Sequence, residues 1–356
     1  MLGSGTITNN PENSMRFLVK VVPAACVAFC LFALPLRVQA GRAYVSNEDG
    51  HTVSVIDTAR RIVIATIQVG KRPRGMQLSR DGSRLYVAVS GRAKCPPKMP
   101  DEQCDRLAHD LSADGIAVVD TRSLKLLRLL PGGSDPERFD LSGTDGRLYI
   151  ANEDTATASV VDVSSGTVLS RIPVGREPEG VRISPKGAWV AVTNETDSTV
   201  SLIDTRTLKV AHTVKVGFRP RDIVFSPDGR IAYVPGEADA TVYRFAMPDG
   251  VPVKLVQLRL GKDLPASLAL DAKRQRLYAV TGRGGMLAVI SLRGSRLLDE
   301  VPVGPRPWGL AITPDGHYVY TANGPSNDVT VVDTETLKVV TRIPVGPAPW
   351  GVVISR

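Results

Sequence analysis

The chain has 356 residues, of which 43% are hydrophobic and 22% charged, and this balance excludes wholesale disorder. Its formal net charge is +8, but no run of five or more like charges occurs, so the basic excess does not indicate a nucleic-acid-binding surface. With 32 Gly, 26 Pro and only 5% aromatic residues, the sequence favours many short elements joined by turns.

Residues 1–40 have the layout of a secretory signal peptide. Arg16 and Lys20 lie beside the start of an apolar run, Val21–Leu36, and the small-residue pattern of residues 38–40 follows it. The apolar run is shorter than the roughly 20 residues that cross a bilayer, which favours a cleaved leader over a membrane anchor.

Export follows from this interpretation. We expect cleavage before Gly41, with translation starting at Met1 or Met15, and a periplasmic or secreted mature protein. Loss of the leader removes three basic residues and one acidic residue, which leaves a net charge of +6. No later stretch is apolar enough to span a membrane, so we expect no membrane span after cleavage.

A proline recurs along the chain at a nearly fixed period. The spacings between successive members are 63, 42, 42, 45, 42 and 42 residues, and the first equals one period plus an insertion at about residues 92–114. The members are Pro73, Pro136, Pro178, Pro220, Pro265, Pro307 and Pro349. A fixed period in this range is typical of a repeat architecture.

Each repeat contains four short runs with strand composition. In the repeat that follows Pro178 they are residues 180–184, 188–194, 199–205 and 208–217, separated by turn sequences such as SPKG and DTRTLK. Four-stranded units of about 42 residues are typical of propeller blades. No helical periodicity extends over 10 or more residues, which excludes helical repeats of similar length.

The two ends of the mature chain are complementary. It begins with the second run of a repeat, at residues 42–47, and finishes with a lone first run at residues 350–356. We therefore predict an all-β, single-domain protein over residues 41–356. It would be a seven-bladed β-propeller with four-stranded blades, closed when the C-terminal strand completes the N-terminal blade. Closure would remove the exposed sheet edges that favour aggregation.

The segments YVSN, YIAN, AVTN and YTAN, at residues 44–47, 149–152, 191–194 and 320–323, resemble the YVTN repeat of a β-propeller family related to WD40-like repeats. The resemblance covers essentially all of residues 42–356. Longer strings, among them RAYVSNED, VGKRPRG and VGREPEG, resemble the subgroup associated with pyrroloquinoline quinone-dependent catabolism.

The subgroup resemblance implies a periplasmic protein that accompanies quinone-dependent alcohol oxidation. It implies a periplasmic partner, a quinoprotein dehydrogenase or a cytochrome, but not that this chain itself binds the quinone. No catalytic residues transfer from the family, and we expect no cofactor, no bound metal, no nucleic-acid partner and a monomeric protein.

Propeller topology places the residue after each repeat proline at the mouth of the central channel, at the start of the innermost strand. In ring order these residues are Arg74, Glu137, Glu179, Arg221, Ala266, Trp308 and Trp350. One arc is charged and the other carries the two tryptophans. The pattern predicts a binding mouth for a ligand or a partner, because Trp and Arg are frequent binding anchors.

Other interpretations of these residues stay open. The Arg and Glu side chains could simply pair, and the tryptophans could pack between blades. The two glutamates could act as acid and base or hold a metal, although neighbouring arginines favour their ionised forms and compete with a cation. The Asn-Glu-Asp segments at residues 47–49 and 152–154 lie on the same face and could bind Ca²⁺, but they more often shape turns.

After export the chain keeps two cysteines, Cys95 and Cys104, both in the insertion. An oxidising compartment and their close spacing predict a disulfide within this loop. The loop lies between the second and third runs of its repeat, hence on the face of the mouth. Long structured loops are often functional.

The sequence thus favours a non-enzymatic periplasmic binding or accessory protein that supports quinoprotein-linked alcohol oxidation. One alternative is a hydrolase like the propeller lactonases, for which the two mouth glutamates are the visible candidates. Another is a nucleic-acid- or surface-binding module. The propeller fold does not choose among them, because propellers have unrelated functions.

Overall fold

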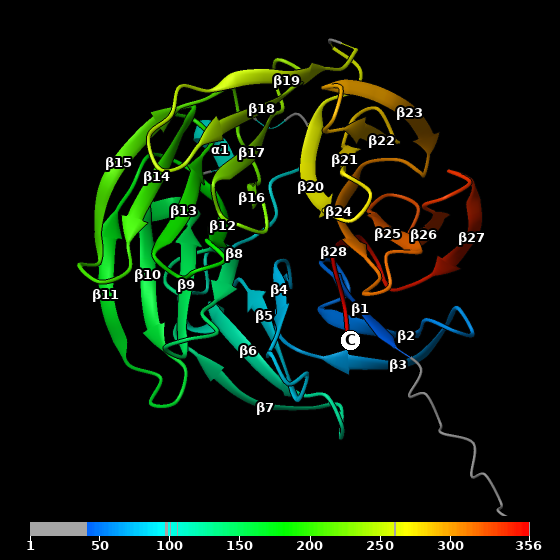
Figure 1. Cartoon of the computed structure of the whole chain (residues 1–356). Coiled ribbons are helices and arrows are strands. Elements are labelled where there is room, and N and C mark those ends of the chain that lie inside the picture. Colours follow the sequence, from blue (N-terminus) through cyan, green and yellow to red (C-terminus); the bar gives the residue numbers. More distant parts are fainter. Residues whose placement is uncertain (1–40, 97–98, 100, 105, 260, 356) are drawn as a thin grey trace, which may run out of the picture. The chain divides into compact units, whose positions relative to one another are not determined.

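The chain forms a ring of seven four-stranded antiparallel sheets within residues 41–355 (Figure 1). The computed structural model describes residues 41–96, 99, 101–104, 106–259 and 261–355. The predicted seven-bladed β-propeller is confirmed, whereas the predicted leader, residues 1–40, lies outside the described residues. Among the described residues no helix is both long and apolar enough to cross a membrane.

Each blade runs from an inner strand at the channel to an outer strand at the rim. In the order inner to outer the blades are β28 (Pro349–Ile354), β1 (Arg42–Asn47), β2 (Thr52–Asp57) and β3 (Ile62–Gln68); β4 (Met76–Leu78), β5 (Arg84–Val89), β6 (Gly115–Asp120) and β7 (Lys125–Leu130); β8 (Pro136–Leu141), β9 (Arg147–Asn152), β10 (Thr157–Asp162) and β11 (Val168–Pro173); β12 (Pro178–Ile183), β13 (Trp189–Asn194), β14 (Thr199–Asp204) and β15 (Lys209–Lys215); β16 (Val224–Phe225), β17 (Ile231–Gly236), β18 (Thr241–Ala246) and β19 (Val253–Gln257); β20 (Pro265–Asp271), β21 (Arg276–Thr281), β22 (Met286–Ser291) and β23 (Arg296–Pro302); β24 (Pro307–Ile312), β25 (Tyr318–Asn323), β26 (Asp328–Asp333) and β27 (Val339–Pro344).

The ring closes as the sequence predicts. The C-terminal strand β28 pairs antiparallel with β1, with Ala43 opposite Ile354 and Val45 opposite Val352. The Ser46 hydroxyl strengthens the junction by donating to the Arg74 carbonyl at 2.7 Å, which links the first blade to the second. One blade is therefore built from both ends of the propeller.

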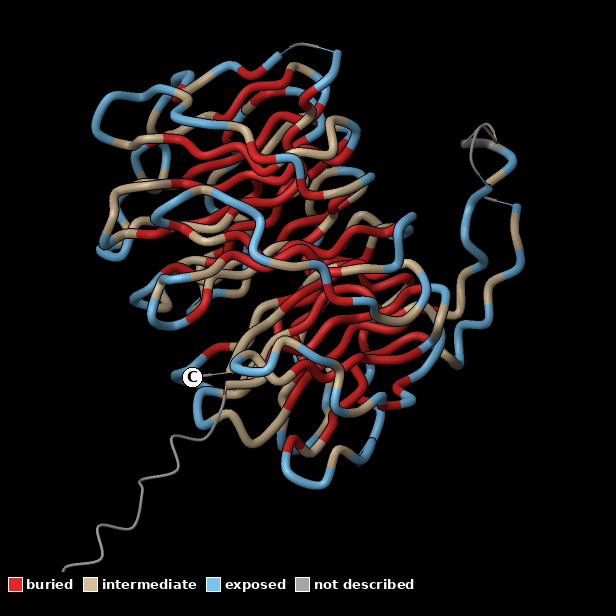
Figure 2. The backbone as a smooth tube through the Cα atoms, turned by 90° about the vertical axis from the view of Figure 1, so that its right-hand side faces the viewer, coloured by how far each residue is buried: buried red, intermediate tan, exposed pale blue. Residues whose placement is uncertain are grey.

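The core lies between neighbouring blades. The two middle strands of each blade are buried on both faces, as in β1 and β2, while the outer strand alternates between exposed and covered side chains, as in β3. Figure 2 shows this division, with the buried backbone in the middle of the blades and exposed backbone in the loops. Burial of β-branched and aliphatic side chains on both faces supplies the main stabilising term.

Polar side chains close the turns of each blade. Asp57 Oδ1 accepts hydrogen bonds from the backbone N–H groups of Ala59 and Arg60, at 3.0 and 2.8 Å. The recurrent asparagine of the second strand acts within its hairpin: Asn194 Nδ2 donates to Thr199 Oγ1 and Ser201 Oγ, each at 2.9 Å. These residues therefore satisfy backbone and hairpin groups locally, which agrees with the turn-forming interpretation.

The inner strands depart from the repeat in two blades. Five inner strands begin at the repeat proline, but β4 and β16 are short and begin three and four residues after Pro73 and Pro220. The expectation that every inner strand starts there is wrong for these two blades. Before β4 the N–H of Gly75 bonds to the Glu137 carbonyl of the next blade, at 3.1 Å, so this backbone links two blades.

The insertion follows β5 and carries a short helix, α1 (Asp101–Cys104), and a 3₁₀ turn, η1 (Leu111–Ala113); a second 3₁₀ turn, η2 (Glu153–Thr155), follows β9. Arg92 and His109 pair as an isolated antiparallel bridge at the base of the insertion. The insertion therefore leaves and rejoins its blade at neighbouring points.

Candidate functional site

All seven residues that follow the repeat prolines gather at one end of the channel. Six of them were predicted as site residues, and together with Ala266 they line a cavity of about 890 Å³, which we call the mouth cavity. The six are Arg74, Glu137, Glu179, Arg221, Trp308 and Trp350. A cavity of this size and mixed lining is typical of a small-molecule site.

The charged side chains at the mouth of the channel form ion pairs with one another. Arg74, which is 2% exposed, forms ion pairs with Glu137 and Asp135 and donates to the Pro136 carbonyl at 2.9 Å. The pairing between adjacent Arg and Glu residues that the sequence left open is thus present. Because both ends of each pair are buried, loss of one partner would leave an uncompensated charge.

Arg221 has the corresponding position on the other side of the acidic residues. Its guanidinium lies 2.7 Å from Glu179, 2.9 Å from Glu195 and 2.6 Å from Glu237. Two arginines thus flank the buried acidic arc, each bound to the mouth glutamate beside it. They fix the orientation of Glu137 and Glu179 at the cavity wall.

Three glutamates converge between these arginines. Carboxylate oxygens of Glu137, Glu153 and Glu179 all lie within 4.8 Å of one another, and we call these residues the carboxyl cluster. Glu153 comes from the second Asn-Glu-Asp segment, in η2. That segment was weighed from the sequence as a calcium site by itself, but its glutamate instead joins the two mouth glutamates.

Burial and mutual repulsion change how the carboxyl cluster titrates. Burial raises the pKa of Glu137 to about 7, against the opposing effect of Arg74 and with a further contribution from Glu179. Burial likewise raises the pKa of Glu179 to about 8, against Arg221 and with Glu195 adding to the rise. The pKa of Glu153 also lies well above its usual range, because of burial and the charges of Glu137 and Glu179.

The carboxyl cluster therefore holds both a proton donor and a proton acceptor near neutral pH. Glu137 Oε2 is buried and has no hydrogen-bond partner among the described residues, which adds to the cost of ionising this carboxyl. The three carboxyls are also close enough to hold a metal ion. Glu137 and Glu179, however, each give one oxygen to an arginine, which reduces the set of free ligands.

Aromatic and cationic groups form the opposite wall. The guanidinium of Arg306 lies 4.9 Å from the ring centre of Trp308, and that of Arg221 lies 5.8 Å from it. The Arg138 guanidinium lies 4.7 Å from the ring centre of Trp350. Cation–π contacts of this length hold the indole rings in place at the cavity wall.

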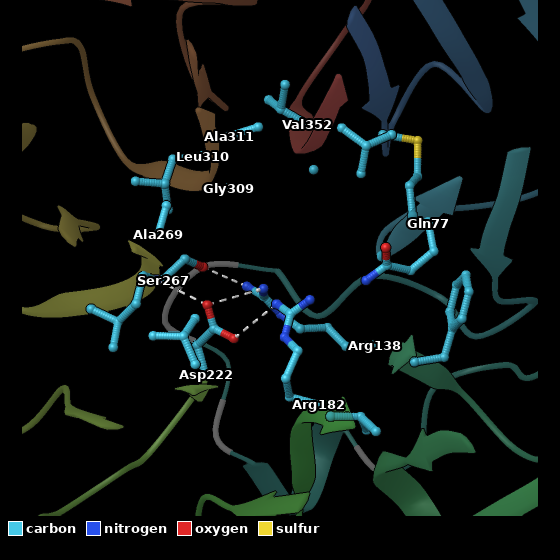
Figure 3. Close-up of a pocket in the computed structure, with 18 of the residues that line it drawn as sticks. Gln77, Arg138, Arg182, Asp222, Ser267, Ala269, Gly309, Leu310, Ala311 and Val352 are labelled. Atoms are coloured by element: carbon cyan, nitrogen blue, oxygen red, sulfur yellow. Dashed lines mark hydrogen bonds and ion pairs between the residues drawn. The ribbon is translucent and has the colours of Figure 1, made fainter. Parts of the chain in front are cut away.

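Arg138 was missed by the sequence analysis. Its guanidinium donates to Ser267 Oγ at 2.5 Å across the channel and lies 3.6 Å from Asp222 (Figure 3). A pattern in the sequence could have revealed it. The residue two positions after the repeat proline is Gly in four repeats, and the three exceptions are these interacting residues, Arg138, Asp222 and Ser267.

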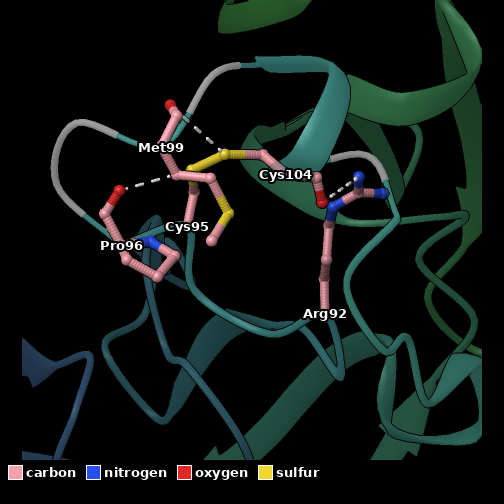
Figure 4. The surroundings of a disulfide bond; sticks show 5 residues. All are labelled: Arg92, Cys95, Pro96, Met99 and Cys104. Atoms are coloured by element: carbon pink, nitrogen blue, oxygen red, sulfur yellow. Dashed lines mark hydrogen bonds between the residues drawn. A yellow bond between two sulfur atoms is a disulfide. The ribbon is translucent and has the colours of Figure 1, made fainter.

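The disulfide loop borders the same cavity. Cys95 and Cys104 form the predicted disulfide, with Cα atoms 5.3 Å apart (Figure 4). Cys95 and Met99 line the mouth cavity, and Lys94 lies 2.9 Å from Glu48 and 2.8 Å from Asp49. The loop is therefore anchored over the cavity beside the first blade.

Comparison with known proteins supports the same fold. A family model described as a YNCE-like beta-propeller matches residues 140–295. The chain is a β-propeller protein. A search of the curated proteins found no significant match. None of these comparisons confirms the subgroup associated with pyrroloquinoline quinone-dependent catabolism, which stays a prediction.

Many solved structures share the architecture. A Pseudomonas aeruginosa periplasmic gluconolactonase aligns with a TM-score of 0.70 and 19% identity, over 89% of this chain and 99% of that one. A putative 6-phosphogluconolactonase from Bacteroides uniformis aligns with a TM-score of 0.70 and 18% identity, over 89% and 100%. A chain of Kuenenia stuttgartiensis hydrazine synthase aligns with a TM-score of 0.69 and 22% identity, over 82% and 92%.

These findings correct the functional expectation. A non-enzymatic accessory protein was favoured from the sequence, but the similar solved propellers include proteins described as lactonases, which favours the hydrolase alternative. The physical reason is the carboxyl cluster. Its third member, Glu153, comes from a different loop, so the sequence showed only two glutamates, each beside an arginine that would keep it ionised.

Proposed function

We propose that this chain hydrolyses lactones, the cyclic esters of hydroxy acids, in the mouth cavity. The observation that carries the proposal is the carboxyl cluster. Glu137 and Glu179, whose pKa values are raised to about 7 and about 8, line the mouth cavity together with two tryptophans, and the partly buried Glu153 lies beside them. Groups whose pKa lies near the working pH are the most effective general acids and bases. The lactonases among the similar solved propellers support the assignment.

The reaction needs one proton acceptor and one proton donor. Glu137, with the lower pKa, removes a proton from water, and the water oxygen bonds to the lactone carbonyl carbon. The bond between that carbon and the ring oxygen then breaks, and the ring oxygen takes a proton from Glu179, which keeps its proton to higher pH. The products are one hydroxy acid and a carboxyl cluster with its proton count unchanged.

The opposite wall binds and orients the ring. Trp308 and Trp350 offer flat apolar faces to the CH groups of a sugar-like lactone. Arg306 lies over Trp308 and has no carboxylate partner among the residues the structure describes, so its charge is free to stabilise the oxyanion of the tetrahedral intermediate.

The proposed chemistry fits the predicted compartment. A disulfide at the cavity rim and the predicted leader support activity outside the cytoplasm. Oxidation of a cyclic hemiacetal gives a lactone, so a lactone hydrolase would act directly after a sugar-oxidising step. The resemblance to propellers associated with pyrroloquinoline quinone-dependent catabolism supports this place in a reaction sequence.

A panel of γ- and δ-lactones of sugar acids and of simple hydroxy acids tests the proposal, with acid release followed by pH-stat and corrected for spontaneous opening. We expect turnover of at least one sugar-acid lactone, and a loss of 10²- to 10⁴-fold in kcat for the Glu179→Gln variant. Glu335→Gln is the matched control, because Glu335 lies in an exposed turn outside the mouth cavity. Absence of turnover across the panel, or equal rates for both variants, would refute the proposal.

A further inference from the structure

The opposite half of the channel contains a second cavity, of about 520 Å³, which we call the lower cavity. It is lined by inner strands from all seven blades, and its apolar wall includes Leu78, Ile183, Phe225, Ile312 and Ile354. The reaction proposed above makes no use of it. The volume falls within the usual range for a small-molecule site.

Three nitrogen-bearing side chains face this cavity. Figure 3 shows the guanidinium groups of Arg138 and Arg182 and the amide of Gln77 directed toward its centre. Arg138 and Trp350 line both the lower cavity and the mouth cavity, so the stacked pair lies between the two. A ligand in the lower cavity would therefore contact one side of Arg138 only.

Asp222 does not satisfy these donors. Its two oxygens accept from the backbone N–H groups of Ile223 and Leu268, at 2.8 and 2.9 Å. It lies 3.6 Å from Arg138 and 3.9 Å from Arg182, beyond the length of a hydrogen bond to a guanidinium. The carboxylate thus contributes charge to both arginines without accepting a hydrogen bond from either.

Asp140, the other acidic residue near Arg182, also accepts hydrogen bonds from the backbone. Its oxygens accept from the N–H groups of Leu141 and Ile183, at 2.9 and 2.8 Å. Burial raises the pKa of Asp140, so this carboxyl is a weaker counter-charge than an exposed aspartate. The carboxylate oxygens of Asp140 and Asp222 therefore all accept hydrogen bonds from backbone N–H groups.

Several donors consequently have no acceptor among the described residues. Arg138 Nε is buried without a partner, the terminal nitrogens of Arg182 make no hydrogen bond, and Arg182 Nε reaches only the Ile223 carbonyl, at 3.4 Å. Figure 3 draws no hydrogen bond between the Gln77 amide and the other lining residues shown. A buried donor without an acceptor is costly, as at Arg138 Nε, whereas the donors of Arg182 and Gln77 are only partly buried and are open to an acceptor group in the cavity.

We propose that the lower cavity binds a small organic carboxylate whose apolar body lies along the aliphatic wall. A carboxylate is an acceptor-only group with two oxygens that match the forked geometry of arginine. Its two oxygens would take hydrogen bonds from the Arg182 guanidinium, Gln77 would donate a further one, and Arg138 would add positive charge beside them. The apolar wall would remove the hydrocarbon part of the ligand from water.

Isothermal titration calorimetry with octanoate as the probe tests this site directly. We expect one octanoate per chain, at least tenfold weaker binding of 1-octanol, and no binding of octyltrimethylammonium. Arg182→Gln and Gln77→Leu should each weaken octanoate binding, the first by at least tenfold. Two separate variants keep the test valid if one of them folds poorly, which circular dichroism reports.

A control variant locates the site. Arg147→Gln removes an arginine of the same blade as Arg138 that does not line the lower cavity, and it should leave binding unchanged. Octanoate binding is measured without any lactone, so failure of this proposal and failure of the proposed hydrolysis are separate results. Equal binding of octanoate and octanol, no octanoate binding, or unchanged affinity in Arg182→Gln and Gln77→Leu would overturn the proposal.

Discussion

Substitution of Glu137 by Gln tests the electrostatics of the carboxyl cluster apart from any activity. Burial raises the pKa of this carboxyl from 4.5 to about 7, even though Arg74 favours its charged form. A carboxyl whose pKa is raised on folding contributes stability that is fully present below pH 4.5 and is lost as the pH rises through 7. The rise corresponds to roughly 3 kcal/mol of unfolding free energy.

The assay is urea unfolding of the wild type and the Glu137→Gln variant at pH 4.5, 6, 7 and 8.5. Gln does not titrate, so the variant should gain roughly 3 kcal/mol on the wild type between pH 4.5 and pH 8.5. The ion pair with Arg74 forms only as Glu137 ionises, and its favourable effect is already contained in the pKa of about 7, so it adds no separate offset.

Asp162→Asn is a matched control from the same blade. Hydrogen bonds from Ser164 and Ser165 lower the pKa of Asp162 to about 2, so its contribution is present above pH 3.8 and is lost only as the pH falls through 2. The difference between this variant and the wild type should be constant from pH 4.5 to pH 8.5. A Glu137→Gln difference that is equally constant over that range would refute the argument that burial raises the pKa of Glu137.

Four further outcomes follow from the structure. Deletion of residues 349–356 should lower the thermal midpoint by on the order of 10 °C, since it removes the buried packing of Trp350 and Val352 and opens the ring; an unchanged melt would contradict closure. Trp308→Ala should raise KM for a lactone by about tenfold with a smaller effect on kcat, as steady-state kinetics will show. A double Cys-to-Ser variant of the disulfide loop should lose at most roughly 2.5–3 kcal/mol of unfolding free energy in urea titrations. Extensive dialysis against EDTA should leave lactone hydrolysis unchanged, and its loss would mean that the carboxyl cluster works by holding a metal.

The fold was predictable from the sequence because the same information occurs seven times. Each repeat supplies a proline before the inner strand and alternating strands, and five of the seven add an Asp that closes a turn, as Asp57 does. A misread element in one blade is therefore corrected by the others. The pairing of the C-terminal strand with β1 also followed, because the propeller starts at a second strand and ends at a first strand.

Only those site residues that occupy an equivalent position in every repeat could be predicted from the sequence. The position after each proline placed Glu137 and Glu179 at one mouth without any knowledge of contacts. The approach of Glu153 depends on a loop whose length differs from blade to blade, and its pKa depends on burial that the sequence does not display. Arg138 is visible only as a break in a position that is otherwise mostly Gly, where inner strands approach closely; a Cβ at Gly180, for example, would lie 2.8 Å from the Asp222 Cα.

The pH dependence of kcat/KM for a sugar-acid lactone tests the central claim most directly. The account predicts a bell-shaped profile, rising as Glu137 ionises with an apparent pKa near 7 and falling as Glu179 loses its proton near 8, after subtraction of spontaneous opening. The ascending limb should vanish in Glu137→Gln together with most of the rate. A profile that only rises with hydroxide concentration, and is the same in wild type and variant, would contradict the assignment of lactone hydrolysis to these carboxyls.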